Sequence, residues 1–280
     1  MSSQVWDEIL ADETRRVTRQ APKQASLLIV AGLDPSGGAG LLADAQVIHE
    51  NGFHAAGVVT ALTEQDSVQC AWMHPVSAEL ISNQIARLID DFEICGVKIG
   101  MLATTEIAHA VARTLRRLVD EGVPIVVDPI LRATRGVPLL EGTPLHALGP
   151  LLEIATLVTP NLDELEALSG RRVTNPDEMR DNARRLRSTA GGLRAVLAKG
   201  GHLPGDPIDV LVDDEGDLSF KGPRVEGPSP HGTGCALSSE IACRLANGTP
   251  LREAVLSATE RVRVRIAEAR TVGRGRPFLG

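Results

Sequence analysis

The sequence predicts an α/β fold, in which a central, mostly parallel sheet carries helices on both faces as three α/β/α layers. Short apolar or β-branched runs alternate along the chain with segments whose apolar residues recur every three or four positions. The first run, LLIVA at residues 27–31, is apolar throughout, which is typical of a strand buried on both faces. A chain of 280 residues also buries enough surface to hold such a fold without disulfides or a structural metal.

Each element follows from these patterns in chain order. Strands are expected at residues 27–31, 54–62, 97–100, 125–128, 157–159 and 194–199. Helices are expected where apolar residues keep a helical spacing, at 41–50, 77–90, 106–121, 162–168 and 177–188. Two further runs, 208–212 and 218–221, flank DDEGD and indicate a hairpin, and helices are expected at 235–246 and 251–269. We therefore predict one domain over residues 26–270, preceded by a partly helical extension at 1–25 and followed by a loose tail at 271–280.

Composition excludes several classes of partner. The chain has 29 Lys and Arg against 36 Asp and Glu, a formal net charge of −7, which argues against nucleic acid or an anionic membrane. Aromatic residues make up only 2% of the chain, too few for a base-stacking platform. No run approaches the roughly 20 apolar residues of a membrane span, and acidic residues stand where a signal peptide would be apolar. We expect a cytoplasmic protein whose four cysteines, which lack a CxxC pair, bind no zinc.

Polar segments after the predicted strands are the candidate site, because parallel α/β sheets bind ligands beyond the carboxyl ends of their strands. In GLDPSGGAG, residues 32–40, glycines such as Gly32 let the backbone approach a ligand, although a tight turn would use them equally. Asp44 is in position to direct a carboxylate back towards this loop, but spacing alone favours a solvated helix residue. The amide of Gln65 complements an aminopyrimidine edge, whereas an ordinary loop glutamine is the simpler interpretation of that residue alone.

Three further strand ends carry charged or amide groups. Asp128 closes the run PIVVD and suits either a magnesium or phosphate site or a turn cap. The three-residue spacing of Asn161 and Glu164 in TPNLDE suits a helix cap and equally suits two oxygen ligands near magnesium. Without other information, the helix cap is the favoured interpretation. Lys199 in AKGGH is placed to add positive charge near phosphates, unless it is an ordinary surface lysine.

The segment HGTGCALSS, residues 231–239, is the most specific of these signals. Gly232, Thr233 and Gly234 precede a helix, so free N–H groups and the helix dipole converge as an anion hole for a transferred phosphoryl group. Cys235 falls in the first helical turn, where we expect a lowered pKa and a thiolate able to take a proton from an alcohol. The alternative is a small buried residue in a glycine-capped helix.

Taken in order, these segments resemble the hydroxymethylpyrimidine/phosphomethylpyrimidine kinases of thiamine biosynthesis, in the ribokinase-like superfamily. The matching stretches cover about residues 27 to 269: AGLDPSGGAGLLAD, VVTALTEQD, VKIGML, VVDPIL, LVTPNLDELEAL, VLAKGGH and HGTGCALSS. The resemblance implies a ribokinase-like α/β domain, usually dimeric. It also implies that ATP, with Mg²⁺, phosphorylates 4-amino-5-hydroxymethyl-2-methylpyrimidine and then its monophosphate.

The resemblance also implies roles for individual residues. On the pyrimidine side, Gln65 holds the ring edge, Asp44 adds a polar contact, Gly32 offers backbone, and Met101 and Ile130 line the ring faces. On the side of the transferred phosphate, the resemblance implies a general base at Cys235 and an anion hole at Gly232, Thr233 and Gly234. It implies contacts to Mg-ATP from Asp128, Asn161 and Glu164, of which Asp128 and Glu164 lie near the metal, directly or through water. Lys199 is implied to lie near the phosphates.

Two other functions stay open at this point. A pyridoxine or pyridoxal kinase is the enzymatic alternative, because related enzymes share the fold and some share the cysteine. A catalytically inactive pyrimidine-binding regulatory protein is the alternative from another class, motivated by departures from the family pattern at Asp66 and at Thr134 and Arg135.

Overall fold

The computed structural model describes residues 24–133, 137–201, 203 and 205–279. The predicted extension at 1–25 therefore lies outside the described residues, except for its last two positions. In chain order, the elements are β1 (Ser26–Leu33), α2 (Gly40–Glu50), β2 (His54–Gln65), β3 (Cys70–Pro75), α3 (Ala78–Asp91), β4 (Ile94–Ile99), α4 (Thr105–Asp120), β5 (Ile125–Val127), α5 (Pro144–Leu152), β6 (Leu157–Val158), α6 (Leu162–Ser169), α7 (Pro176–Thr189), β7 (Ala195–Ala198), β8 (Ile208–Asp213), β9 (Gly216–Lys221), α8 (Thr233–Ala246) and α9 (Leu251–Ala267).

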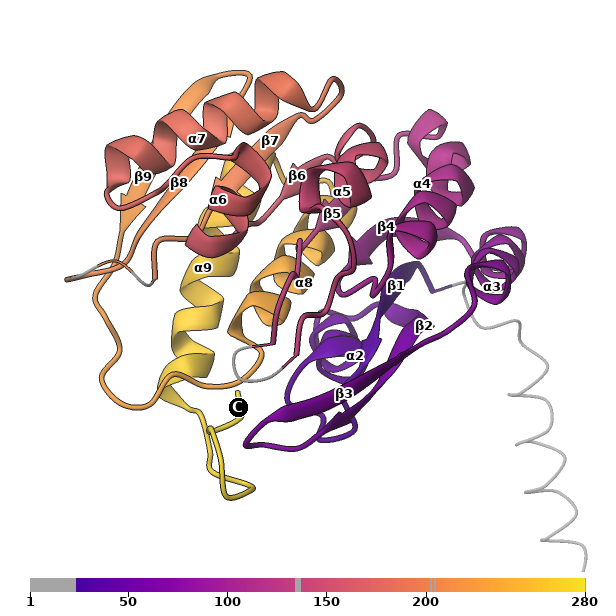
Figure 1. Ribbon diagram of the computed structural model, residues 1–280, viewed down its shortest axis with the longest axis horizontal. Helices are drawn as coiled ribbons and strands as arrows, with labels where there is room; N and C mark the ends of the chain where they lie inside the picture. Colours follow the sequence, from indigo (N-terminus) through magenta and orange to yellow (C-terminus); the bar gives the residue numbers. More distant parts are fainter. Residues whose placement is uncertain (1–23, 134–136, 202, 204, 280) are drawn as a thin grey trace, which may run out of the picture.

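The strands form one sheet in the order β3-β2-β1-β4-β5-β6-β7-β8-β9 (Figure 1). The six inner strands run parallel; in sheet order they are β2, β1, β4, β5, β6 and β7. Antiparallel strands complete both edges, β3 beside β2 and the β8–β9 hairpin beside β7. The predicted mostly parallel sheet and the predicted hairpin are confirmed. Parallel order brings the carboxyl ends of six strands to one edge, where a ligand site is expected.

Helices cover both faces of the sheet, as predicted. Helices α3 to α7 pack over one apolar cluster, and α2, α8 and α9 over the other. The sequence of β1 is apolar without interruption because both faces of the strand are buried. Leu28 and Val30 belong to the first cluster, while Leu27 and Ile29 belong to the second. All four side chains are fully buried.

Two elements were not predicted. Strand β3, with the sequence CAWMHP, lies at an edge and leaves most of its side chains exposed, so it has neither an apolar run nor a clear alternation. Helix α5 contains Gly149 and Pro150, which weaken the helical pattern, and it is held by four buried leucine and alanine side chains instead. Both elements depend on tertiary packing that local sequence does not encode.

Residues 271–279, where a loose tail was predicted, are irregular in structure but hydrogen-bond to the rest of the domain. Arg270 and Phe278 exchange backbone hydrogen bonds of 2.9 and 2.8 Å, and the N–H of His231 donates to the carbonyl of Pro277 at 2.8 Å. The chain therefore folds back on itself after α9 and joins the segment that precedes α8. The sequence did not predict this pairing, because the segment has few apolar residues and the contacts are mostly made by the backbone.

A buried ion pair joins the sheet to two helices. The Nζ atom of Lys98 on β4 lies 2.5 Å from a carboxylate oxygen of Asp44 on α2, and both side chains are fully buried. The hydroxyl of Ser239 on α8 donates to the other carboxylate oxygen at 2.9 Å. Burial alone would lower the pKa of Lys98, but the Asp44 carboxylate raises it above its usual value, so the lysine stays charged.

In the part of the chain that the structure describes, no helix combines the length and the apolar character that crossing a membrane requires.

The ion pair generates a prediction about stability. We expect Asp44→Ala to lower the free energy of unfolding by about 3–5 kcal/mol, because it leaves the Lys98 ammonium buried without a partner. The double variant Lys98→Met/Asp44→Ala should lose less, since no buried charge remains. Urea unfolding at pH 7 measures both. Asp90→Ala is the matched control, because Asp90 pairs with Arg117 at an exposed site. Its loss should lower the free energy of unfolding by at most about 1 kcal/mol. A loss in Asp44→Ala no larger than that of the control would contradict the prediction.

Candidate active site

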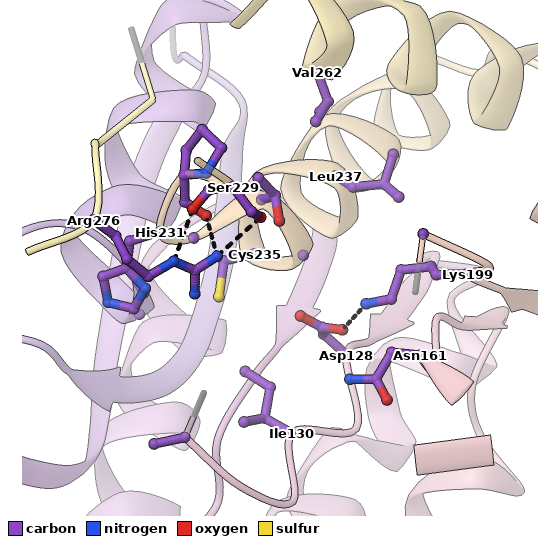
Figure 2. A pocket seen from close by; sticks show the side chains of 18 of the residues that line it. Asp128, Ile130, Asn161, Lys199, Ser229, His231, Cys235, Leu237, Val262 and Arg276 are labelled. Atoms are coloured by element: carbon purple, nitrogen blue, oxygen red, sulfur yellow. Dashed lines mark hydrogen bonds and ion pairs between the residues drawn. The ribbon is translucent and has the colours of Figure 1, made fainter. Parts of the chain in front are cut away.

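A cavity of about 1040 Å³ opens where the parallel strands end (Figure 2). Its wall contains every site residue predicted from the sequence except Asp44: Gly32, Gln65, Met101, Asp128, Ile130, Asn161, Glu164, Lys199, Gly232, Thr233, Gly234 and Cys235. The order of the parallel strands brings these segments together, although they are separated by up to 200 residues of chain.

Asp44 requires a correction. It is neither a solvated helix residue nor part of the cavity wall, because its carboxylate is fully buried against Lys98 and Ser239. Lys98 does line the cavity. Lys98, which was not predicted as a site residue, is therefore the member of this ion pair that borders the cavity. A lysine inside an otherwise apolar predicted strand, VKIG, was the available signal.

One end of the cavity holds a cluster of three polar side chains. Nε2 of Gln65 donates to a carboxylate oxygen of Asp34 at 3.0 Å and lies 2.9 Å from Nε2 of His231. The same nitrogen of His231 lies 3.0 Å from that oxygen of Asp34. Burial opposes ionisation of Asp34, yet hydrogen bonds from His231 and Ser36 hold its pKa below the usual value. The amide of Gln65 is thus held through its NH₂ group.

Apolar side chains line the same cavity. The methyl group of Met101 occupies the space that a side chain at Gly32 would need. Ile130, which follows β5, lines the same cavity and is half-buried. These residues suit a small planar ring whose edge is bound by an amide.

Opposite charges gather at another part of the wall. Nζ of Lys199 lies 2.9 Å from a carboxylate oxygen of Asp128, and the hydroxyl of Thr159 donates to the same oxygen at 3.1 Å. In Figure 2 this pair, with Asn161 beside it, faces the start of α8 across the cavity. A Cβ atom on Gly234 would come within 3.2 Å of Nζ of Lys199. A cationic group and the α8 N-terminus therefore border the same space.

Asn161 and Glu164 form the helix cap that their spacing favoured. The side chain of Asn161 accepts from the N–H of Glu164 at 3.0 Å, and the Glu164 carboxylate accepts from the N–H of Asn161 at 2.8 Å. Burial raises the pKa of Glu164 to about 7, with Lys199 opposing the rise and Asp128 adding to it. Both residues also line the cavity, so the cap does not exclude a second role.

The two carboxylates fit a magnesium ion only together with a phosphate ligand. Among the residues that the structure describes, no group of three or more His, Cys, Asp or Glu side chains is arranged to hold a metal alone. Asp128 and Glu164 supply hard oxygen atoms near Lys199, and magnesium is commonly bound by one or two carboxylates, waters and substrate phosphates. The donor set therefore suits a metal that arrives with a nucleotide.

The glycines before α8 form the predicted turn. Gly232 is the N-cap, with φ of 81°, and a side chain there would collide with the carbonyl of Gly38. The glycine loop after β1 and the loop before α8 are thus in contact. The first N–H groups of a helix have no partner within it, and Thr233, Gly234 and Cys235 all line the cavity, so the start of α8 is suited to an anion.

The expected lowering of the pKa of Cys235 is wrong for the free protein. Burial raises the pKa of this thiol to about 12; Lys98 opposes the rise, whereas Asp44 and Asp128 add to it. The side chain is only 6% exposed, so desolvation of a thiolate outweighs the favourable helix N-terminus. Sequence position revealed the helix dipole, but not the depth of the residue.

Apolar residues from α8 and α9 form a part of the wall that was not predicted. Leu237 and Val262 lie on one side of the Lys199–Asp128 pair in Figure 2, and Ile266 of α9 lines the same cavity together with Val225 from the loop before α8. Helical spacing predicts such side chains to be buried, and does not distinguish a core from a ligand pocket. Asp34 and His231, which stand inside quoted motifs, were also missed as site residues.

The comparisons with known proteins agree with this geometry. The sequence profile of a family described as Phosphomethylpyrimidine kinase matches residues 34–278. The chain is 39% identical to the hydroxymethylpyrimidine/phosphomethylpyrimidine kinase of Streptomyces coelicolor, with 89% of this chain and 91% of that protein aligned. It is also 39% identical to the thiamine biosynthesis bifunctional protein ThiED of Geobacter sulfurreducens, over 92% of this chain, and spans about half (52%) of that longer protein.

Solved structures of two related kinases superpose on the fold. An ADP complex of Bacillus subtilis pyridoxal kinase has a TM-score of 0.81 at 27% identity, covering 92% of this chain and 97% of that one. The phosphomethylpyrimidine kinase of Clostridium difficile 630 has a TM-score of 0.73 at 30% identity, covering 86% and 99%.

The buried thiol generates a prediction about reactivity. At pH 7 a pKa of about 12 leaves roughly one Cys235 thiol in 10⁵ ionised, so iodoacetamide should modify it slowly in the free protein. The rate, followed by peptide mass spectrometry, should rise about tenfold per pH unit between pH 7 and 9, because only the thiolate reacts. Lys98→Met should slow it further, since Lys98 lowers this pKa. The half-buried Cys95 in the same digest controls for reagent access. A plateau in the rate already at pH 7 would show that the thiolate is formed.

Proposed function

Because the chain belongs to the phosphomethylpyrimidine kinase family, we propose that it transfers phosphoryl groups from ATP to 4-amino-5-hydroxymethyl-2-methylpyrimidine and then to the monophosphate, in thiamine biosynthesis. The observation that carries the proposal is the content of one cavity. It holds an amide fixed by Asp34, apolar side chains, a glycine-capped helix start with a cysteine, and a lysine–aspartate pair.

The pyrimidine binds at the Gln65 end of the cavity in this proposal. The NH₂ group of Gln65 donates to Asp34, so its carbonyl oxygen is the atom left to accept from the 4-amino group of the ring. Met101 and Ile130 contact the two ring faces. This pose directs the hydroxymethyl group towards Cys235 and the start of α8.

ATP binds at the opposite end. Lys199 and the N–H groups at the start of α8 contact its phosphates, and the apolar surface of Leu237 and Val262 takes the adenine. The related Bacillus subtilis pyridoxal kinase forms an ADP complex, which supports nucleotide binding by this fold. Asp128 and Glu164 would hold Mg²⁺ through the phosphates and water, and the metal would neutralise charge on the transferred group.

The transfer itself requires one proton to move. The hydroxymethyl oxygen bonds to the γ-phosphorus, the bond from that phosphorus to the β,γ-bridging oxygen breaks, and ADP leaves. Cys235 takes the hydroxyl proton as a thiolate, the minor form that the Lys98 ammonium favours. The α8 N–H groups stabilise negative charge on the transferred phosphoryl oxygens. The second transfer differs, because a phosphate acceptor is already anionic and has no proton to lose at neutral pH.

Assembly as a homodimer and a cytoplasmic location are also proposed. Leu62 on β2 and Trp72 on β3 are large apolar side chains that are about half exposed, which suits a surface covered by a second copy. The four cysteines are free thiols, which suits a reducing compartment.

Pyridoxal kinase is the second candidate, favoured by the superposition with the Bacillus subtilis enzyme. Its substrate is also a small ring with a hydroxymethyl group. The curated relatives at 39% identity favour the pyrimidine.

The first test measures ADP release with Mg-ATP on three acceptors: the hydroxymethylpyrimidine, its monophosphate and pyridoxal. We expect turnover on both pyrimidines and kcat/KM on pyridoxal at least about tenfold lower, because Gln65 is held to accept a hydrogen bond from an amino group. Turnover on pyridoxal alone would replace the proposed substrate. Binding of the pyrimidine by calorimetry without any turnover would instead favour a regulatory protein.

Cys235→Ala tests the proton transfer. We expect a loss of roughly 10²–10⁴ in kcat on the hydroxymethylpyrimidine, the usual range for a general base. On the monophosphate the loss should be at least about tenfold smaller, because no proton has to be removed from that acceptor. The two acceptors thus control for each other in one protein. Equal losses on both would point to a packing defect, and full activity on the alcohol would place the proton elsewhere.

A further inference from the structure

The C-terminal segment contacts the loops that bound one end of the active site. Residues 270–279 leave α9, turn at Gly273 to Gly275 and return beside Arg270. In Figure 1 the segment descends from α9 past the end of β3 before it returns.

Its first attachment is to the turn between β2 and β3. The N–H of Gly275 donates to the hydroxyl of Ser67 at 3.0 Å, and the N–H of Arg276 donates to the Ser67 carbonyl at 3.0 Å. A side chain on Gly275 would collide with that carbonyl, so the approach requires glycine. Ser67 lies two residues beyond Gln65 and lines the cavity.

Its second attachment is to the segment before α8. Nε of Arg276 donates to the carbonyl of Ser229 at 2.8 Å, and one terminal nitrogen donates to the Ser229 hydroxyl at 2.9 Å and the Pro230 carbonyl at 2.8 Å (Figure 2). Arg276 is itself part of the cavity wall. The guanidinium therefore holds the two residues that precede His231.

Its third attachment is to His231. The backbone N–H of His231 donates to Pro277, and the ring of Phe278 packs on the imidazole with centroids 6.1 Å apart. A Cβ on Gly38 would touch both rings, so the glycine loop after β1 packs against them. His231 in turn contacts Asp34 and Gln65, the groups at the pyrimidine end.

We propose that residues 270–279 form part of the acceptor half of the site, with Arg276 and Phe278 as positioning residues that hold His231 and thereby Gln65. The proposal rests on the proposed function for the identity of the acceptor. The three attachments fix the turn after β2, the segment before α8 and the His231 ring, all on the Gln65 side of the cavity. The segment thus governs acceptor binding and leaves ATP binding unaffected.

Steady-state kinetics with separate KM values tests this. Arg276→Ala should raise KM for the hydroxymethylpyrimidine about tenfold or more, because several charge-assisted hydrogen bonds are lost, while KM for ATP stays within about twofold. Arg276→Lys should not restore it, since one ammonium does not reproduce a planar, multiply donating group. Phe278→Ala should act in the same direction.

Arg261→Ala is the matched control. Arg261 has the same charge, is exposed on α9 and is not among the cavity-lining residues, so its variant should behave as the wild type. Thermal unfolding of each variant separates positioning from folding. An unchanged acceptor KM in both Arg276→Ala and Phe278→Ala would overturn the proposal, as would equal rises in both KM values.

Limited proteolysis distinguishes failure of this proposal from failure of the proposed function. Trypsin cleaves after Arg270 and Arg274, and saturating hydroxymethylpyrimidine should slow both cleavages by at least about threefold, whereas ATP alone should not. Protection by the pyrimidine in a protein without turnover would retain the positioning role and reject the kinase activity. If turnover is normal, the pyrimidine does not slow cleavage and Arg276→Ala has an unchanged acceptor KM, the positioning role alone would be rejected.

Discussion

The ion pair between Lys98 and Asp44 is the interaction on which the site most depends. It joins β4 to α2 in the interior, and Ser239 of α8 joins the same carboxylate. Helices α2 and α8 each follow a glycine loop, and these loops touch at Gly38 and Gly232. A buried charge is stable only with its partners in place, so the pair fixes both loops relative to the sheet. The pair also acts on Cys235 in both directions, since the Lys98 ammonium lowers the pKa of that thiol and the Asp44 carboxylate raises it.

The cavity separates two kinds of chemistry. Its Gln65 end offers an amide held by Asp34 and apolar side chains, a combination that suits a neutral ring and costs little to preorganise. Its Lys199 end holds charges that are partly compensated, since Asp128 accepts from both Lys199 and Thr159. The start of α8 lies between them. A helix N-terminus offers positive potential without a mobile side chain, which suits charge that develops only during a reaction.

The sequence predicted correctly those features of the fold and the site that depend on short stretches of neighbouring residues. Uninterrupted apolar runs predicted the inner strands, and the glycine loops predicted where the cavity lies, because both signals are local. It failed where an outcome depends on depth or on distant partners. Nothing near Asp44 indicates that Lys98 lies opposite, and a helix start alone does not reveal that burial dominates the pKa of Cys235. Backbone pairing after α9 has no apolar signature at all.

The order of the sheet also sets an order of events during synthesis. Strand β1 is an early element of the chain, yet it lies between β2 and β4 in the sheet. Its side chains at residues 27–30 are apolar towards both faces. Until residues 94–99 have left the ribosome, one edge of β1 has no partner, an interval of several seconds at about 5–20 residues per second. A nascent chain of this length thus exposes one unpaired edge of an apolar strand, which is the kind of surface that aggregates before folding is complete.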